Sequence, residues 1–175
     1  LGEMGGSLSH ESAPSLTVLG DGTLVGQEKY LGGVRGEDGR AYGIPGHARR
    51  VLRVDDATGR VDHIGPEFPG KYKWLRGVAC CSKLFAIPCH AERVLVIIPS
   101  TGEVRLIGPR FPGEWKWHGA VIGDDGMIYA IPQTADRVLR IDPQTEEASM
   151  VGPSLGTQRN KWYGGLKAAN GAIYG

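Results

Sequence analysis

The stretch GRAYGIPGHARRVLRVDDATG (residues 39–59) recurs along the chain as SKLFAIPCHAERVLVIIPSTG (82–102) and as GMIYAIPQTADRVLRIDPQTE (126–146). An aromatic residue keeps step with these copies, at Tyr30, Trp74, Trp117 and Trp162, at spacings of 44, 43 and 45 residues. Repeats of this length are typical of propellers and solenoids, in which stacked copies cover one another's apolar faces.

Each unit consists of short apolar stretches separated by turn sequences, without the 3.6-residue periodicity of a helix. Asp38-Gly39, Asp125-Gly126 and Asn170-Gly171 lie between the first two stretches of their units. Such pairs predict hairpins with type I′ turns, which require positive φ at both central residues. In the second unit Cys81-Ser82 stands there, one residue shorter, so that hairpin must be built differently. A second turn and two further strands complete each unit, which predicts a four-stranded antiparallel propeller blade of about 44 residues.

The sequence therefore predicts an all-β fold, a β-propeller forming a partial ring. The predicted propeller domain covers residues 15–175 and follows an irregular segment at 1–14. Its blades span about 30–73, 74–116 and 117–161, with a partial blade at 162–175 and an isolated strand at 15–20. Closed propellers have about 4 to 8 blades. We therefore expect either that the sequence is part of a longer polypeptide, the interpretation that we favour, or that further copies complete the ring by pairing edge strands.

The segments IYAIPQTADR (128–137) and VLRIDPQTEEASMVG (138–152) resemble the repeats of YVTN-type and quinoprotein-like β-propellers. The units are still more similar to those of uncharacterised repeat proteins from algae and other protists. The resemblance covers about residues 30–175 and implies propeller architecture. It implies no particular function, because propellers serve both binding and catalysis.

Composition narrows the choice of partners. Lys and Arg number 20 against 19 Asp and Glu, so the charge argues against nucleic acid as a partner. No apolar run approaches 18 residues, so we predict no transmembrane segment.

The odd cysteine count, Cys80, Cys81 and Cys89, predicts reduced thiols rather than a disulfide framework. No cofactor is predicted. The sequence lacks HExxH and P-loop motifs, so we assign no catalytic residue and lean away from an enzyme.

The predicted binding site lies on the propeller face that carries the linkers between blades and the loops between second and third strands. Aromatic residues beside charged ones on long loops are typical of protein-binding surfaces. The predicted partner-binding residues are Lys71, Tyr72, Lys73, Glu114, Trp115, Lys116 and Arg159. Phe68 and Phe111 occur in matching linkers, and we expect them to pack between blades instead.

Two histidines support an alternative. His47 and His90 occupy equivalent places in adjacent units and could bind a metal or small ligand, although Thr134 stands in the third unit. The sequence thus favours a non-catalytic interaction or structural module with protein partners, an accessory part of a larger assembly. The alternative is a propeller enzyme or a small-ligand or metal binder that uses the central channel face.

Overall fold

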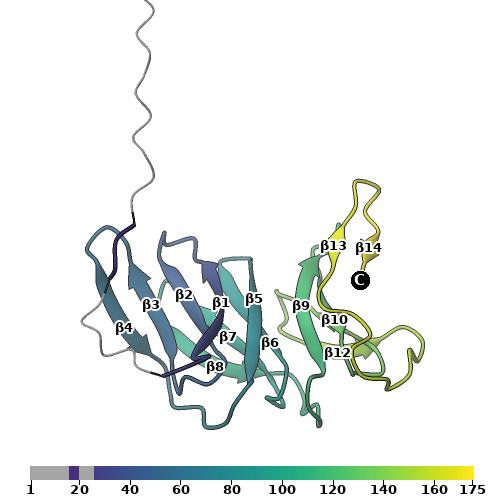
Figure 1. Ribbon diagram of the computed structural model, residues 1–175. Helices are drawn as coiled ribbons and strands as arrows, with labels where there is room; N and C mark the ends of the chain where they lie inside the picture. Colours follow the sequence, from purple (N-terminus) through teal and green to yellow (C-terminus); the bar gives the residue numbers. More distant parts are fainter. Residues whose placement is uncertain (1–15, 20–25) are drawn as a thin grey trace, which may run out of the picture.

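The computed structural model describes residues 16–19 and 26–175, and every regular element in these ranges is a β-strand (Figure 1). The strands of the first two sheets are β1 (Tyr30–Arg35), β2 (Ala41–Pro45), β3 (Val51–Asp55), β4 (Arg60–Ile64), β5 (Trp74–Cys80), β6 (Lys83–Pro88), β7 (Val94–Ile98) and β8 (Glu103–Ile107). The remaining strands are β9 (Trp117–Ile122), β10 (Ile128–Pro132), β11 (Val138–Ile141), β12 (Ala148–Val151), β13 (Leu166–Lys167) and β14 (Ile173–Tyr174). None of the described residues belongs to a helix that could cross a bilayer.

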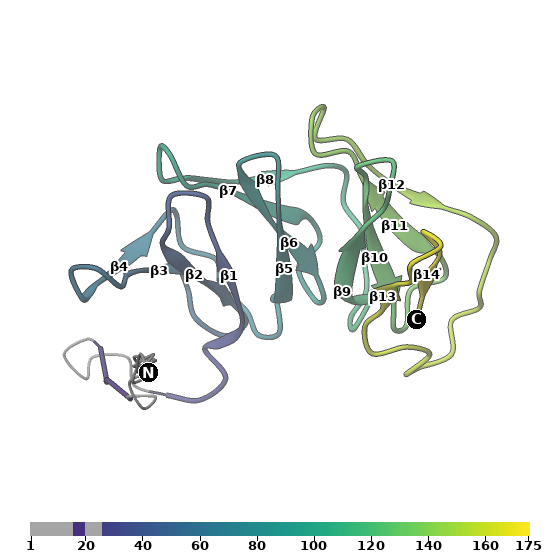
Figure 2. The ribbon, with the colours of Figure 1, turned by 90° about the horizontal axis from the view of Figure 1, so that it is seen from above.

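The strands form three four-stranded antiparallel sheets, each in sequence order, and a two-stranded sheet of β13 and β14. Figure 2 shows the sheets side by side along an arc. The first strands of successive sheets are neighbours, β1 beside β5 and β5 beside β9. The predicted all-β fold with four-stranded blades is therefore confirmed, and the described residues do not close a ring.

Two apolar clusters hold the sheets together. Between the first and second sheets, Tyr42 and Ile44 pack with Trp74, Leu95 and Ile97, all at most 2% exposed. The second cluster joins the second and third sheets and contains Phe85, Ile87, Val94, Val96, Ile107, Phe111, Trp117, Ile128, Ala130, Leu139, Ile141 and Ala148. Each pair of neighbouring sheets therefore buries apolar side chains between the two facing surfaces, as repeat stacking requires.

The tryptophans at the start of the second and third units belong to these clusters. The indole N–H of Trp74 donates to the carbonyl of Arg93 at 2.9 Å, and that of Trp117 donates to Arg137 at 2.8 Å. Phe68 and Phe111 make edge-on contacts with the same two rings, at centroid distances of 5.1 and 5.3 Å. The expectation that these linker phenylalanines pack between blades is confirmed.

The hairpin turns differ from the prediction. In the first unit Gly39 has φ of 84°, whereas Asp38 has no positive φ. The Gly39 N–H donates to Gly36 O at 3.0 Å, so the reversal is centred one residue earlier than a type I′ turn at Asp38-Gly39 requires. The Asp38 carboxylate accepts the Tyr42 hydroxyl at 2.8 Å, which fixes the turn onto β2. In the second unit, Cys81 and Ser82 both have positive φ, 53° and 59°, as a type I′ turn requires.

The strand predicted at 15–20 lies partly outside the described residues. The described part, 16–19, is exposed and forms no strand. Residues 16–19 pair with none of the described strands, so no ladder of hydrogen bonds holds them as a strand.

A partly buried ion cluster links the second and third sheets. Glu146 lies in the turn between β11 and β12 with φ of 63°, where the other units have Gly59 and Gly102. Its carboxylate accepts from Lys83 Nζ on β6 at 2.7 Å and from both terminal nitrogens of Arg105 on β8, one of them at 2.7 Å. The hydrogen bonds from Arg105, and then those from Lys83, lower the pKa of Glu146 to about 2.

We expect Glu146→Gln to lower the free energy of unfolding by about 1–3 kcal/mol at pH 7, because it removes a partly buried negative charge that two cations contact. A carboxyl group with a lowered folded-state pKa stabilises above its unfolded pKa and loses that contribution as the pH falls toward about 2. Chemical denaturation between pH 6 and pH 2 should therefore show the difference from wild type shrinking with acidity. Glu147→Gln, at the exposed neighbouring residue, is the control. If the difference in unfolding free energy between wild type and Glu146→Gln stays constant across this pH range, the ion cluster does not lower the pKa of Glu146.

Candidate functional site on the loop face

The linkers between sheets share one local conformation. Glu28, Tyr72, Trp115 and Asn160 all have φ between 49° and 59° and stand at spacings of 44, 43 and 45 residues. Each precedes a lysine and then the aromatic anchor of its unit. Left-handed φ is unfavourable for a bulky residue, so the surrounding hydrogen bonds must hold it. For Trp115 these include bonds from Thr134 N–H and Thr134 Oγ1, at 3.0 and 2.8 Å, to its carbonyl.

This conformation brings four of the predicted residues into one aromatic row. The His47 ring contacts Tyr72 edge-on at a centroid distance of 4.3 Å, and Tyr72 contacts Trp115 at 4.8 Å. His90 contacts Tyr72 at 5.4 Å and Trp115 at 4.7 Å. The row therefore spans the loops and linkers of consecutive units, and all four side chains are partly buried.

The row is bordered by carboxylates. The Tyr72 hydroxyl donates to Glu28 Oε2 at 2.9 Å, and His47 Nε2 lies 3.5 Å from the same oxygen. Glu114 Oε1 lies 3.9 Å from His90 Nδ1. Burial lowers the pKa of His90, while the Glu114 carboxylate acts in the opposite direction. Both imidazoles contact the Tyr72 ring, His47 edge-on and His90 at an interplanar angle of 52°. The Nε2 atoms of both histidines are buried without a hydrogen-bond partner among the described residues.

Lys73 and Lys116 do not belong to the surface on which the sequence placed them. Each is 4% exposed. Lys116 Nζ donates to the carbonyls of Cys89, Ala91 and Gly113 at 2.8–3.0 Å. Their ammonium groups therefore have no free N–H for a partner. This correction leaves five of the seven predicted residues: Lys71, Tyr72, Glu114, Trp115 and Arg159.

The two lysines join adjacent blades. Lys73 Nζ reaches the carbonyls of Gly46 and Ala48 in the preceding loop and that of Gly70 in its own linker, at 2.8–3.0 Å. The arrangement at Lys116 is equivalent. Burial lowers the pKa of Lys73 and of Lys116 to about 8. Each ammonium group has three N–H donors and lies within hydrogen-bonding distance of three carbonyl oxygens, so its hydrogen-bonding capacity is fully used.

A hollow of about 300 Å³ lies at one end of the aromatic row and is lined by Glu114, Trp115, Thr134, Thr157 and Arg159. Three predicted residues therefore line this hollow, Glu114, Trp115 and Arg159, and they supply a carboxylate, an indole ring and a guanidinium group. Lys71 lies instead along a second hollow of about 500 Å³ that also contains His90 and Glu114. Such surfaces combine apolar contact with charge-based orientation.

The cysteines are free thiols. Cys80 Sγ and Cys81 Sγ lie 3.4 Å apart at the end of β5, and Cys89 is buried. Burial is the main cause that raises the pKa of Cys80 and of Cys89 to about 11, so both are protonated thiols at neutral pH. Within residues 16–19 and 26–175, no three His, Cys, Asp or Glu side chains converge as a metal site would require.

The inner strands border a separate hollow of about 560 Å³ on the side where a central channel would run. Half of its lining residues are glycines, and Arg76, Tyr163 and Tyr174 carry the ionisable side chains. Tyr163 stacks on His118 at a centroid distance of 3.6 Å. This lining contains no carboxylate or histidine that could serve as a general base.

Comparisons with known proteins indicate the fold. No protein-family model matches the sequence, and no curated protein does. Among solved structures, catalytically inactive virginiamycin B lyase from Staphylococcus aureus with quinupristin has a TM-score of 0.63 and 14% identity, over 82% of this chain and 47% of that one. Hydrazine synthase from Kuenenia stuttgartiensis has a TM-score of 0.59 and 18% identity, over 86% of this chain and 42% of that one.

A third similar structure is an extracellular domain described as part of a one-component system, from Bacteroides thetaiotaomicron. Its TM-score is 0.60 at 11% identity, over 82% of this chain and 20% of that one. The chain thus spans less than half the length of these three structures. None of them bears on the expected likeness to algal and protist proteins, which stays a prediction. At such low identities the likeness concerns the fold alone, and both the sheets and these neighbours show that the chain has a β-propeller fold.

Proposed function

We propose that this chain is a non-catalytic protein-interaction module, an accessory part of a larger assembly, that contacts its partner through the loop face. The observation that carries the proposal is the aromatic row of Tyr72 and Trp115, which the linkers hold in left-handed backbone conformation at the surface. Preorganised aromatic side chains lose little entropy on binding and dominate interface energies.

Charge supports a particular kind of partner segment. Glu114, Trp115 and Arg159 line the smaller hollow, and Lys71 lines the larger one. A segment with an apolar or aromatic anchor flanked by charges of both signs would complement this surface. The lining of the inner-strand hollow includes no carboxylate or histidine, and the rings of His47 and His90 contact Tyr72, so the enzyme or metal-binding alternative has weaker support.

The Tyr72→Ala/Trp115→Ala double variant tests the proposal. Selection of peptides from a display library on the wild-type protein should yield a consensus that contains the expected anchor. We expect the double variant to bind the selected peptides at least about tenfold more weakly, because truncating central aromatic residues costs about 2 kcal/mol or more.

The matched control is Tyr163→Ala, which removes a 71% exposed aromatic side chain from the inner-strand hollow. It should leave peptide binding unchanged. Circular dichroism and thermal unfolding should show that the double variant remains folded. Loss of folding would assign Tyr72 and Trp115 to the core, and equal binding by wild type and double variant would refute the proposed face.

A further inference from the structure

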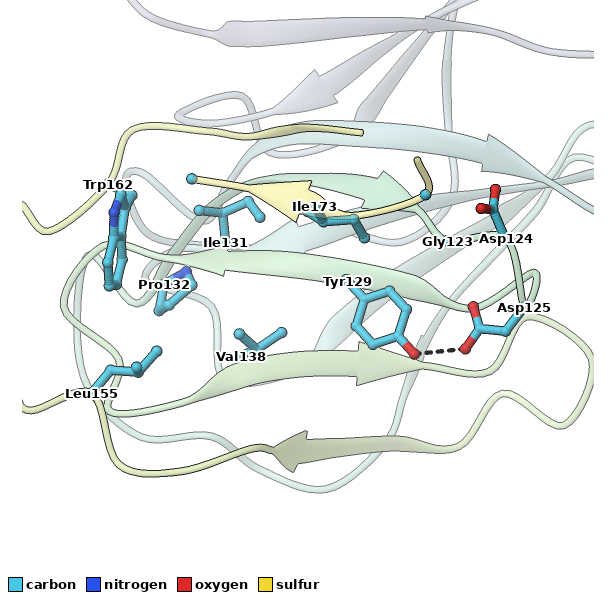
Figure 3. A pocket seen from close by; sticks show the side chains of 12 residues that line it. Gly123, Asp124, Asp125, Tyr129, Ile131, Pro132, Val138, Leu155, Trp162 and Ile173 are labelled. Carbon is cyan, nitrogen blue, oxygen red and sulfur yellow. Dashed lines mark hydrogen bonds between the residues drawn. The ribbon is translucent and has the colours of Figure 1, made fainter. Parts of the chain in front are cut away.

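An apolar groove of about 520 Å³ lies between the third sheet and β14. Figure 3 shows Ile131 and Ile173 along its upper side and Val138 and Leu155 along its lower side, with Trp162 at the end opposite Asp125. Tyr129 lies at one end, where its hydroxyl donates to Asp125 Oδ2 at 2.6 Å. The groove therefore runs along the face of the third sheet that lies toward the incomplete fourth unit.

The repeat shows what covers this face elsewhere. Tyr42 and Val51, the first-unit counterparts of Tyr129 and Val138, are 1% and 0% exposed. They are covered by side chains from the third and fourth strands of the next sheet, which are Leu95 and Ile97 on β7 and Val104 on β8. Tyr129 and Val138 remain partly exposed, and no described strand of the fourth unit corresponds to β7 or β8.

The indole of Trp162 gives a second, independent indication. In the second and third units the indole N–H donates to the carbonyl of the arginine that precedes the third strand. The corresponding arginine of the fourth unit would follow Gly175, and the Trp162 indole makes no hydrogen bond with any residue of 16–19 or 26–175. A strand in the groove would supply this acceptor.

Three equivalent glycines give a third indication. A Cβ placed on Gly65 would lie 2.5 Å from Val104 on β8, and one on Gly108 would lie 2.8 Å from Ala148 on β12. Gly65 and Gly108 thus receive a side chain from the fourth strand of the next sheet. A Cβ on Gly152 would meet no described atom within 4 Å. The space for a fourth strand is therefore open beside Gly152.

The free edge of β14 sets the register of an incoming strand. In the second sheet Leu84 pairs with Ile97 and Ala86 with Leu95. In the third sheet Ile128 pairs with Ile141 and Ala130 with Leu139. Ile173 and Gly175 are the equivalent residues of the fourth unit. A strand that adds to β14 would thus place a leucine opposite Gly175 and an isoleucine or valine opposite Ile173.

We propose that the groove binds an antiparallel β-hairpin with the residue pattern of β7–β8 and β11–β12, which completes the fourth blade. Its first strand carries the leucine and isoleucine, its second strand places valine or alanine over Gly152, and its backbone accepts the Trp162 N–H. A second copy of this chain is a poor source, because each of its third and fourth strands is already paired within a sheet. The proposal goes beyond the proposed function and is independent of the loop face.

A synthetic peptide of residues 135–152, ADRVLRIDPQTEEASMVG, is the probe. We expect saturable binding with a dissociation constant on the order of 10–100 μM, because the hairpin must become ordered when it binds. Tryptophan emission should shift to shorter wavelength as Trp162 becomes buried, and Trp162→Phe should abolish that shift. The same peptide with serine in place of Leu139 and Ile141 should bind at least about tenfold more weakly.

Protein variants locate the bound peptide. Ile173→Asp should abolish binding, whereas Met150→Asp, at a 49% exposed residue of β12 outside the groove, should not. Thermal unfolding checks that both variants are folded. If Ile173→Asp does not fold, the comparison of the two peptides on the wild-type protein still tests the proposal. No saturable binding up to about 1 mM, or equal binding of both peptides, would overturn the proposal. A dimer in sedimentation that Ile173→Asp dissociates would assign the groove to a second copy and also overturn it.

Discussion

Replacement of Lys116 by methionine is expected to lower the free energy of unfolding by about 2–4 kcal/mol, the largest effect of any single side chain on the loop face. The carbonyls of Cys89, Ala91 and Gly113 would lose their shared donor. Buried acceptors without a partner cost about 1–3 kcal/mol each. Part of this cost is offset, because the variant no longer has to bury a charged ammonium group. Urea denaturation at pH 7 measures the difference.

Lys71→Met is the matched control, since Lys71 is exposed in the equivalent linker one unit earlier. We expect Lys71→Met to change the free energy of unfolding by no more than about 0.5 kcal/mol. Lys73→Met should reproduce the loss at the first junction. Similar stabilities for Lys116→Met and Lys71→Met would show that water replaces the ammonium, and the assigned role of the buried lysines would be wrong.

Gly32→Ala should destabilise the protein by about 2–4 kcal/mol. A Cβ on Gly32 in β1 would lie 2.4 Å from the carbonyl oxygen of Leu75 in β5, so the inner strands would have to move apart. Backbone atoms cannot rotate away as a side chain can, which makes this overpacking costly.

The adjacent Gly33 is the control for this substitution. Its Cβ would have a nearest neighbour at 3.7 Å, an ordinary contact. Gly33→Ala should therefore be neutral or stabilise by up to about 1 kcal/mol through the unfolded chain. Thermal unfolding of the two variants gives the comparison, and equal midpoints would contradict the close approach of β1 and β5.

The architecture could be predicted because the repeat gives the same evidence several times. Each aromatic anchor, each apolar strand and each turn recurs at a fixed spacing, and Trp74 and Trp117 lie where that spacing predicts. The type of hairpin turn was harder to predict. Asp-Gly also suits a reversal in which only the glycine has positive φ, and the hydrogen bond from Tyr42 to Asp38 depends on the opposite strand.

The buried lysines could not be recognised from residue type, because lysine is almost always exposed. A signal was nevertheless present. Lysine precedes the aromatic anchor in all four units, at Lys29, Lys73, Lys116 and Lys161, and surface lysines have no reason to recur so regularly. The contacts of His47 with Tyr72 depend on the left-handed linker conformation, which local sequence does not indicate for tyrosine.

The lysine of each linker has a consequence for how such a protein can change in length. The lysine side chain forms hydrogen bonds with the preceding unit. The aromatic residue that follows the lysine packs within the unit that it begins. A duplicated segment that starts at a linker would therefore carry both attachments with it. Gene duplication could lengthen the array one unit at a time without any compensating substitution at the new junction.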